Sequence, residues 1–208
     1  MCGRYSILTE DEIIEIREII QEVSLRISHD DFQNNSDTAA TEIFPTNNAP
    51  VIISDGEGAV SFENLRWGFQ RWDGKGVIIN ARSETLKTKN LFSRLLTVGR
   101  CVVPAGEYYE WEKIGKEKIK HFIKDTEGNI LFFAGLYQDT SDGREFVIIT
   151  KEAVGDVEKI HNRMPVILKA EQIENWLNGN LSPEEITKLN FNVNVAPCEN
   201  DFLQMKIF

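Results

Sequence analysis

The sequence lacks any long apolar run. No hydrophobic stretch among its 208 residues approaches the roughly 20 residues that a membrane span needs. The N-terminus also lacks the charged-then-apolar pattern of a secretory signal. A hydrophobic fraction of 41% and a mean hydropathy of −0.30 are typical of an ordinary globular chain. The length predicts a sizeable core in a single domain over residues 1–208. The absence of a long apolar run predicts that the protein has no membrane partner.

Cysteine is scarce, and its pattern argues against two common uses of this residue. The three cysteines, Cys2, Cys101 and Cys198, are odd in number and far apart in the sequence. This pattern argues against a disulfide framework and favours a reducing compartment. Neither a CxxC nor an HxxxH spacing occurs, which argues against a structural zinc site. We also expect no other metal and no cofactor.

An excess of positive charge is also missing. The chain has 23 Lys and Arg residues against 33 Asp and Glu residues, which gives a net charge of −10. Phosphate binding usually relies on Lys and Arg, so this balance taken alone argues against a nucleic-acid partner. The acidic residues concentrate in 10–22 and 171–185, however, which are typical of solvated helix faces. A local basic groove on an acidic protein therefore stays open as a prediction.

Short strand-like runs separated by turn residues make up the middle of the chain. The turn signals include Asp55-Gly56, Glu127-Gly128 and Asp142-Gly143. The runs cover 51–53, 60–62, 77–80, 101–103, 108–111, 121–123, 130–137 and 146–150. Such closely spaced runs predict a mainly antiparallel sheet.

Helical patterns flank these runs and interrupt them once. Thr9 and Glu12 form a capping box ahead of apolar residues at helical spacing over 13–23, and a loop-like polar stretch follows at 30–41. Helices are also predicted at 170–177 and at 183–189. A middle helix is predicted at 84–96, with four leucines buried: Leu86, Leu91, Leu95 and Leu96. The sequence thus predicts an α+β fold with helices at the margins of the sheet.

The first residues carry the most specific chemical signal. Cys2 has a small side chain behind the initiator methionine, which predicts removal of Met1 and a cysteine with a free α-amine. The amine can form an imine with an aldehyde, and the thiol can close onto that imine as a five-membered thiazolidine. Ordinary pKa values of about 7.7–8.0 for an α-amine and about 8.5 for a thiol leave both groups reactive near neutral pH. Taken alone, Cys2 also fits an accident of the start codon.

Three further segments place polar groups where a buried strand would prefer apolar ones. They cover 78–84, 100–111 and 160–168, and each has a structural explanation when taken alone. Asn80 would fit a turn cap, Glu110 an outward strand face, and His161 a hydrogen-bonded core histidine.

Five motifs that include these segments occur together, in a fixed order, over nearly the whole chain. They are Met1-Cys2-Gly3-Arg4, Arg66-Trp67-Gly68, Asn80-Ala81-Arg82-Ser83-Glu84, Tyr109-Glu110-Trp111 and His161-Asn162-Arg163-Met164-Pro165. In their order and approximate spacing they resemble the SRAP (SOS-response-associated peptidase) family, which includes proteins that crosslink to abasic DNA. The resemblance implies one domain with a curved antiparallel, barrel-like sheet and peripheral helices. It also implies a shallow channel for single-stranded DNA.

The resemblance implies roles for four catalytic residues. Cys2 matches the family's nucleophile, and Asn80 matches the asparagine that orients the N-terminal residue. Glu110 matches a general acid–base, and His161 matches a histidine beside the reacting sugar. These residue types suit the chemistry, because an abasic deoxyribose exposes its aldehyde only after a proton transfer opens the ring.

The resemblance also implies DNA contacts. Arg4 and Arg82 match arginines that hold phosphates, and we expect Arg163 to join them in binding DNA. Trp67 is similar to the aromatic residue that lines the DNA groove. Two regions depart from the family pattern: 69–72 lacks the usual proline, and 192–195 matches only weakly.

The leading hypothesis is therefore a monomeric, cytoplasmic DNA-damage protein, associated with the nucleoid when it is on DNA. It would bind abasic sites in single-stranded DNA, form a thiazolidine through Cys2 and protect the site, with weak lyase activity from the imine. A second hypothesis is a thiol-dependent autopeptidase of the SOS response, in which self-cleavage unmasks Cys2. A third is a reader of modified bases that needs no intact Cys2.

Overall fold

The computed structural model describes residues 2–6, 14–16, 18–19, 26–27, 42–54 and 59–198. Residues 14–16 and 18–19 are helical, as the apolar spacing predicts. Within this helix Ile16 is buried in the core, whereas Ile14 is exposed. The capping box of Thr9 and Glu12 and the polar stretch 30–41 lie outside the described residues.

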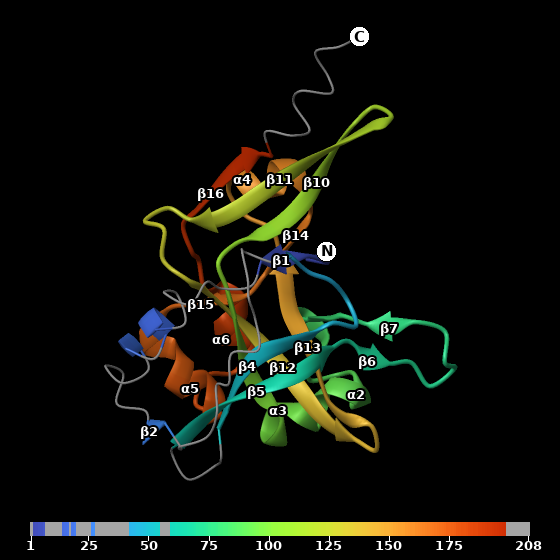
Figure 1. Ribbon diagram of the computed structural model, residues 1–208, viewed down its shortest axis with the longest axis vertical. Coiled ribbons are helices and arrows are strands. Elements are labelled where there is room, and N and C mark those ends of the chain that lie inside the picture. The colour runs from blue at the N-terminus through green and yellow to red at the C-terminus, as the bar shows by residue number, and fades with distance from the viewer. Residues whose placement is uncertain are drawn as a thin grey trace.

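Five strands form a closed ring, the barrel-like part of the fold (Figure 1). They are β4 (Asn48–Ser54), β5 (Ala59–Trp67), β9 (Arg100–Ala105), β12 (Leu131–Thr140) and β13 (Gly143–Glu152). Antiparallel pairing runs in the order β13, β12, β9, β4, β5. A parallel pairing of β13 with β5 closes the ring and sets Phe146 opposite Trp67.

β4, β9, β12 and β13 contain continuous buried runs because both faces of the sheet are covered there, whereas β5 is mixed polar and apolar. Alternate side chains of β12 enter two separate hydrophobic clusters. Phe132, Ala134 and Leu136 join helix residues in one cluster, whereas Leu131 and Phe133 join the other. The second cluster also contains residues of a second sheet, so one set of strands supports two cores.

The second sheet is antiparallel and contains the N-terminal strand. In spatial order it comprises β16 (Val193–Pro197), β11 (Glu117–Asp125), β10 (Tyr108–Ile114), β1 (Tyr5–Ser6) and β3 (Glu42–Ile43). Tyr5 pairs with both Tyr108 and Ile43, and all three belong to the hydrophobic cluster that contains Cys2. Figure 1 shows β10, β11 and β16 above the ring, with β1 and the N-terminus at the junction. The start of the chain is thus fixed between the two sheets.

Short strands connect the motif segments to the ring. They are β2 (Arg26–Ile27), β6 (Phe69–Gln70), β7 (Val77–Ile78), β8 (Asn80–Arg82), β14 (Arg163–Pro165) and β15 (Ile167–Leu168). β6 and β7 form a hairpin, and β8 pairs parallel with β13. β14 pairs with the end of the same strand β13, so the segments that contain Asn80 and Arg163 come close together.

Two of the predicted helices form as expected. The 170–177 helix comprises a 3-10 turn η2 (Ala170–Gln172) and α5 (Ile173–Leu177). The 183–189 helix is α6 (Pro183–Lys188), where Ser182 Oγ accepts a hydrogen bond from the Glu185 backbone N–H. The sequence did not predict α4 (Asp156–Ile160), which ends just before His161.

The predicted middle helix at 84–96 is wrong as a single element. The chain forms a 3-10 turn η1 (Ser83–Thr85) and two short helices, α2 (Asn90–Ser93) and α3 (Leu95–Val98). Thr88 Oγ1 donates to the Thr85 carbonyl oxygen, and such local bonds from Ser and Thr compete with a regular helix. Leu91, predicted to be buried, is 42% exposed, and Phe92 enters the core instead.

The predicted fold class is confirmed: a mainly antiparallel, barrel-like α+β core with helices at its periphery (Figure 1). Every strand-like run of the sequence overlaps a strand, although 77–80 is split at Ile79 into β7 and β8. Over the described part of the chain, no helix is long and apolar enough to cross a membrane.

Candidate active site

Cys2 lies where the two sheets meet and has no exposed surface. Asn80, the first residue of β8, donates a hydrogen bond from Nδ2 to the Cys2 carbonyl oxygen over 2.9 Å. Its other amide atom, Oδ1, is buried and has no hydrogen-bond partner among the described residues. Asn80 therefore fixes the backbone of Cys2, and its Oδ1 is available to accept a further hydrogen bond there.

Strand β10 supplies the carboxyl group of the site. Tyr5 lies directly opposite Tyr108, and Glu110 shares a face with Tyr108 because it lies two residues further along the strand. Glu110 is buried, with 3% of its surface exposed. Its negative charge raises the pKa of Cys2, which requires that the two groups lie within electrostatic reach.

Burial shifts the pKa of both groups upward. The pKa of Glu110 is raised, chiefly because burial disfavours the carboxylate, while positive charges at the amino terminus and at His161 oppose the shift. The pKa of the Cys2 thiol is raised well above its ordinary value, first by burial and second by the charge of Glu110. In this state the site holds a neutral thiol beside a carboxyl group that is readily protonated.

His161 follows α4 directly and is half-buried. Its Nδ1 lies 3.0 Å from the Arg163 backbone nitrogen and 3.3 Å from the Arg163 carbonyl oxygen, and the shorter contact favours the neutral tautomer in which Nδ1 accepts and Nε2 carries the proton. A positive charge on His161 lowers the pKa of Glu110, so the two side chains lie within electrostatic reach of each other. Thiol, carboxyl and imidazole thus converge from three distant segments, an arrangement suited to nucleophilic attack on a carbonyl carbon with proton transfer.

The two arginines predicted to hold phosphates lie in different settings. Arg82 ends β8 and is exposed. Arg4 is half-buried, and its Nη1 lies 3.1 Å from the Glu42 carboxylate. Its guanidinium also lies over the rings of Phe44 and Trp111, at 4.3 Å and 4.9 Å from their centroids. Both arginines thus lie within two residues of Cys2 or Asn80 in sequence.

Trp67 does not line a groove. It is fully buried, donates from Nε1 to the Ile79 carbonyl oxygen over 3.0 Å and stacks on Phe146. Its ring also meets Tyr5 edge to face at 5.2 Å. As the last residue of β5, it points into the cluster beneath Cys2. The prediction that it contacts a base is therefore wrong, and its role is to support the floor of the site.

Arg163 is also placed differently from its predicted role. The side chain is buried and makes two hydrogen bonds to the Glu84 carboxylate, at 2.8 Å and 3.0 Å. A further bond of 2.6 Å reaches the Thr150 carbonyl oxygen. A phosphate would have to displace Glu84, so we withdraw the predicted DNA contact. Arg163 instead ties the segment after His161 to the segment after Asn80.

Sequence reasoning missed an exposed aromatic residue in the segment before β8, Trp72. It lies in the turn of the β6–β7 hairpin and is 96% exposed. The signal for it was present: Asp73-Gly74 between apolar runs marks a hairpin turn, and a tryptophan in such a turn has no core to fill. The hairpin precedes β8, so Trp72 lies eight residues before Asn80 in the sequence, in the turn at the outer end of the hairpin.

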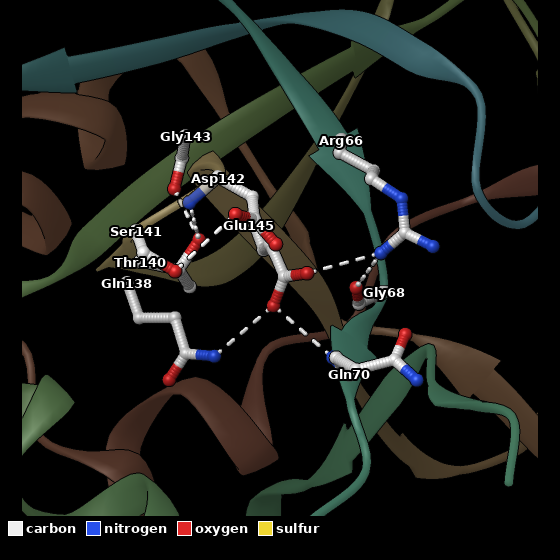
Figure 2. Close-up of polar contacts among 9 residues, drawn as sticks. All are labelled: Arg66, Gly68, Gln70, Gln138, Thr140, Ser141, Asp142, Gly143 and Glu145. Atoms are coloured by element: carbon white, nitrogen blue, oxygen red, sulfur yellow. Dashed lines mark hydrogen bonds and ion pairs between the residues drawn. The ribbon is translucent and has the colours of Figure 1, made fainter. Parts of the chain in front are cut away.

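A buried carboxylate fixes the base of this hairpin (Figure 2). Glu145 on β13 accepts from Arg66 Nη1 at 3.0 Å, from the Gln70 backbone N–H at 3.1 Å and from Gln138 Nε2 at 3.2 Å. Arg66 also donates to the Gly68 carbonyl oxygen. The Arg66-Trp67-Gly68 motif therefore acts as a brace for the hairpin. Among the described residues, no group of three His, Cys, Asp or Glu side chains is placed to hold a metal ion.

The fold agrees with comparisons to known proteins. A family model described as SOS response associated peptidase (SRAP) matches residues 1–205, and the chain belongs to this family. Abasic site processing protein YoqW of Bacillus subtilis (strain 168) is 36% identical over 202 residues, covering 91% of this chain and 86% of the relative. Abasic site processing protein HMCES of Gallus gallus is 31% identical over 198 residues, covering 75% of this chain and 57% of the relative.

Solved structures give the same fold. A crystal structure of a protein from Bacteroides thetaiotaomicron superposes with a TM-score of 0.77 at 26% identity, covering 98% of this chain and 94% of that one. A phage-related protein from Bordetella bronchiseptica gives a TM-score of 0.71 at 22% identity, covering 95% and 94%.

The ion pair between Glu84 and Arg163 generates a prediction about stability. Glu84→Gln should lower the free energy of unfolding by about 1–3 kcal/mol, because Arg163 keeps a buried charge without its full partner. The pKa of Glu84 is lowered, chiefly by hydrogen bonds from Arg163. Its stabilisation is therefore present above the ordinary carboxyl pKa and is lost as the pH falls through the lowered one.

Thermal unfolding between about pH 7 and about pH 3 tests this pair. The wild type should lose a stabilisation on acidification that Glu84→Gln has already lost. Glu184→Gln is the matched control, because Glu184 forms an ion pair with Lys87 that is more than half exposed on both sides. Equal melting temperatures of Glu84→Gln and Glu184→Gln at neutral pH would contradict the structural role of Arg163.

Proposed function

We propose that this protein recognises abasic sites in single-stranded DNA and joins to them covalently through Cys2. The observation that carries the proposal is the buried Cys2, held through its carbonyl by Asn80 beside a carboxyl group with a raised pKa. Relatives named for abasic site processing support the substrate class. The protein would act in the cytoplasm, on the nucleoid while it holds DNA.

The joining reaction forms two bonds to one carbon. Once Met1 is removed, the α-amine of Cys2 attacks the C1′ aldehyde of the opened sugar, and loss of water gives an imine. The thiol then adds to the imine carbon while its proton goes to the nitrogen, which closes the thiazolidine. The sum releases one water and consumes no co-reactant. Elimination from the imine, before the ring closes, would cut the strand and account for a weak lyase activity.

The site residues divide the proton transfers among them. Burial raises the pKa of Glu110 and so favours its protonated form, which can deliver a proton to the ring oxygen as the sugar opens. His161, with its proton on Nε2, donates a hydrogen bond to the released hydroxyl. The Oδ1 of Asn80 accepts from the α-amine and directs its lone pair at the aldehyde.

The DNA strand would run past the β6–β7 hairpin and the end of β8. Arg82 is exposed there for one phosphate, and Arg4 lies on the other side of Cys2 for another. We assign base stacking to Trp72 in place of Trp67, because the Trp72 ring is exposed whereas the Trp67 ring is fully buried.

A second candidate activity is self-removal of Met1 by the Cys2 thiol, which the family description as a peptidase favours. Self-removal would use the same Glu110 and would produce the amine that the crosslink needs. Synthesis in a translation system without aminopeptidase separates the two sources of cleavage. Mass spectrometry would then find Met1 removed from the wild type but retained in Glu110→Gln if the protein cleaves itself.

The covalent step is tested with single-stranded DNA that contains one abasic site. Wild-type protein should give an adduct that survives a denaturing gel, and a fusion that stays ahead of Cys2 should abolish it. Cys2→Ala keeps the amine but cannot close the ring. It should give a borohydride-trappable imine with more strand cleavage and little stable adduct. A stable adduct from Cys2→Ala at wild-type yield would show that the thiol is dispensable.

The role of Glu110 predicts a pH profile. Glu110→Gln should slow adduct formation by about 10²–10⁴-fold, because an amide cannot deliver the proton. The wild-type rate should fall as the pH rises through the raised pKa of Glu110, and this limb should vanish in the variant. Glu117→Gln, at an exposed position on β11, is the control. A folded, DNA-binding Glu110→Gln with the wild-type rate would refute the assignment.

The two tryptophans predict opposite phenotypes. Trp72→Ala should weaken binding to single-stranded DNA by about 1–3 kcal/mol, which is roughly 5–150-fold in Kd, and leave the melting temperature unchanged. Trp67→Phe should lower the melting temperature, because it removes a buried hydrogen bond, and leave the affinity of the folded protein unchanged. Fluorescence anisotropy and thermal unfolding measure the two effects. The reverse pattern would return base stacking to Trp67.

A further inference from the structure

One carboxylate joins two cations close to Cys2. The Oε2 of Glu42 lies 3.1 Å from Arg4 Nη1, and the Oε1 of Glu42 accepts a hydrogen bond from Lys120 Nζ. Each carboxylate oxygen therefore faces its own cation. A phosphodiester presents the same pattern, since it has two non-bridging oxygens on one phosphorus atom.

The three residues meet on one face of the second sheet. Glu42 is opposite Ser6 on the neighbouring strand, and Lys120 is opposite Trp111. Both positions alternate with the inward side chains Tyr5 and Tyr108, so this face points away from the core. The cluster is linked to the nucleophile through the backbone, because two residues of extended chain keep the Cα atoms of Arg4 and Cys2 within about 7 Å.

Aromatic rings hold both cations in place. The guanidinium of Arg4 lies over Phe44 at 4.3 Å and over Trp111 at 4.9 Å. The ammonium of Lys120 lies 3.9 Å from the centroid of the Tyr109 ring. Cation–π contacts of this kind cover the faces of a guanidinium and leave its N–H edge directed at an anion. The two cations are therefore arranged before any ligand arrives.

The Glu42 carboxylate is well placed to be exchanged. The side chains of Arg4, Glu42 and Lys120 are 28%, 30% and 17% exposed, so solvent and solutes reach all three. Ion pairs that water can reach contribute little to stability and are readily replaced by another anion. A DNA strand whose abasic aldehyde reacts with Cys2 would carry such an anion, the phosphodiester next to the abasic nucleotide.

We infer that Arg4 and Lys120 together form a binding site for the phosphodiester beside the abasic nucleotide, and that Glu42 is the internal anion which this phosphate displaces. The inference rests on the proposed function and adds to it a second phosphate contact, Lys120, and a competing carboxylate. Because undamaged strands must also displace Glu42, the competition lowers affinity for intact DNA. Retention then depends on the covalent bond, which only an abasic site can form.

Removal of the competing charge tests the inference. In anisotropy titrations with an intact single strand, Glu42→Gln should bind roughly 3–30-fold more tightly than the wild type. Glu63→Gln is the matched control: it removes the same charge from a carboxylate that pairs with Arg144, outside the site. It should change the affinity by less than about twofold.

The contribution of Lys120 to phosphate binding is tested in the same assay. Lys120→Met should weaken binding and make the log–log salt slope shallower by about 0.7, the value for one phosphate on a single strand. Lys118→Met is the control, because Lys118 lies on the same face of β11 two residues away. The gain from Glu42→Gln should shrink in the Lys120→Met background.

The outcomes separate this inference from the proposed function. If Glu42→Gln matches Glu63→Gln or binds more weakly than the wild type, Glu42 is a structural brace and the inference is wrong. Equal effects of Lys120→Met and Lys118→Met also overturn it. In both cases wild-type adduct formation would leave the proposed function standing. If the wild type neither binds single strands nor forms an adduct, the proposed function fails and this inference fails with it.

Discussion

The site depends on one hydrogen bond, from the amide of Asn80 to the carbonyl oxygen of Cys2. The first residues of a chain are usually poorly ordered unless something ties them down. Here Asn80 supplies one tie, and the pairing of β1 with β10 supplies another, with the Tyr109 N–H donating to the Arg4 carbonyl oxygen. Cys2 thereby becomes a fixed part of the core, and its thiol acquires a defined position.

The ring of strands that supports this site has two covered faces. The helices cover one face, and the second sheet covers the other. Cys2, Tyr5 and Trp67 lie in the cluster between the sheets, so the site has a rigid apolar floor. That floor also causes the raised pKa values of Cys2 and Glu110, because both groups lose contact with water there. Packing and reactivity thus have the same physical origin.

The sequence predicted what local pattern and motif order can encode. Strand runs, the capped helix α6 and the fold class follow from periodicity and turn residues, and the structure brings Cys2, Asn80, Glu110 and His161 into one region. The sequence could not show which motif residues face the core. Trp67 and Arg163 share the polar or amphipathic character of ligand-binding residues, yet tertiary packing buries both. The pairing of Glu84 with Arg163 joins positions 79 apart, which no local rule reveals.

Burial of the nucleophile also affects how it survives in the cell. The thiolate is the form that oxidants and electrophiles attack, and the raised pKa keeps Cys2 in the thiol form while no substrate is present. Oxidising conditions damage DNA and unprotected thiols together. A shielded cysteine would therefore remain intact under the very stress that creates its substrate.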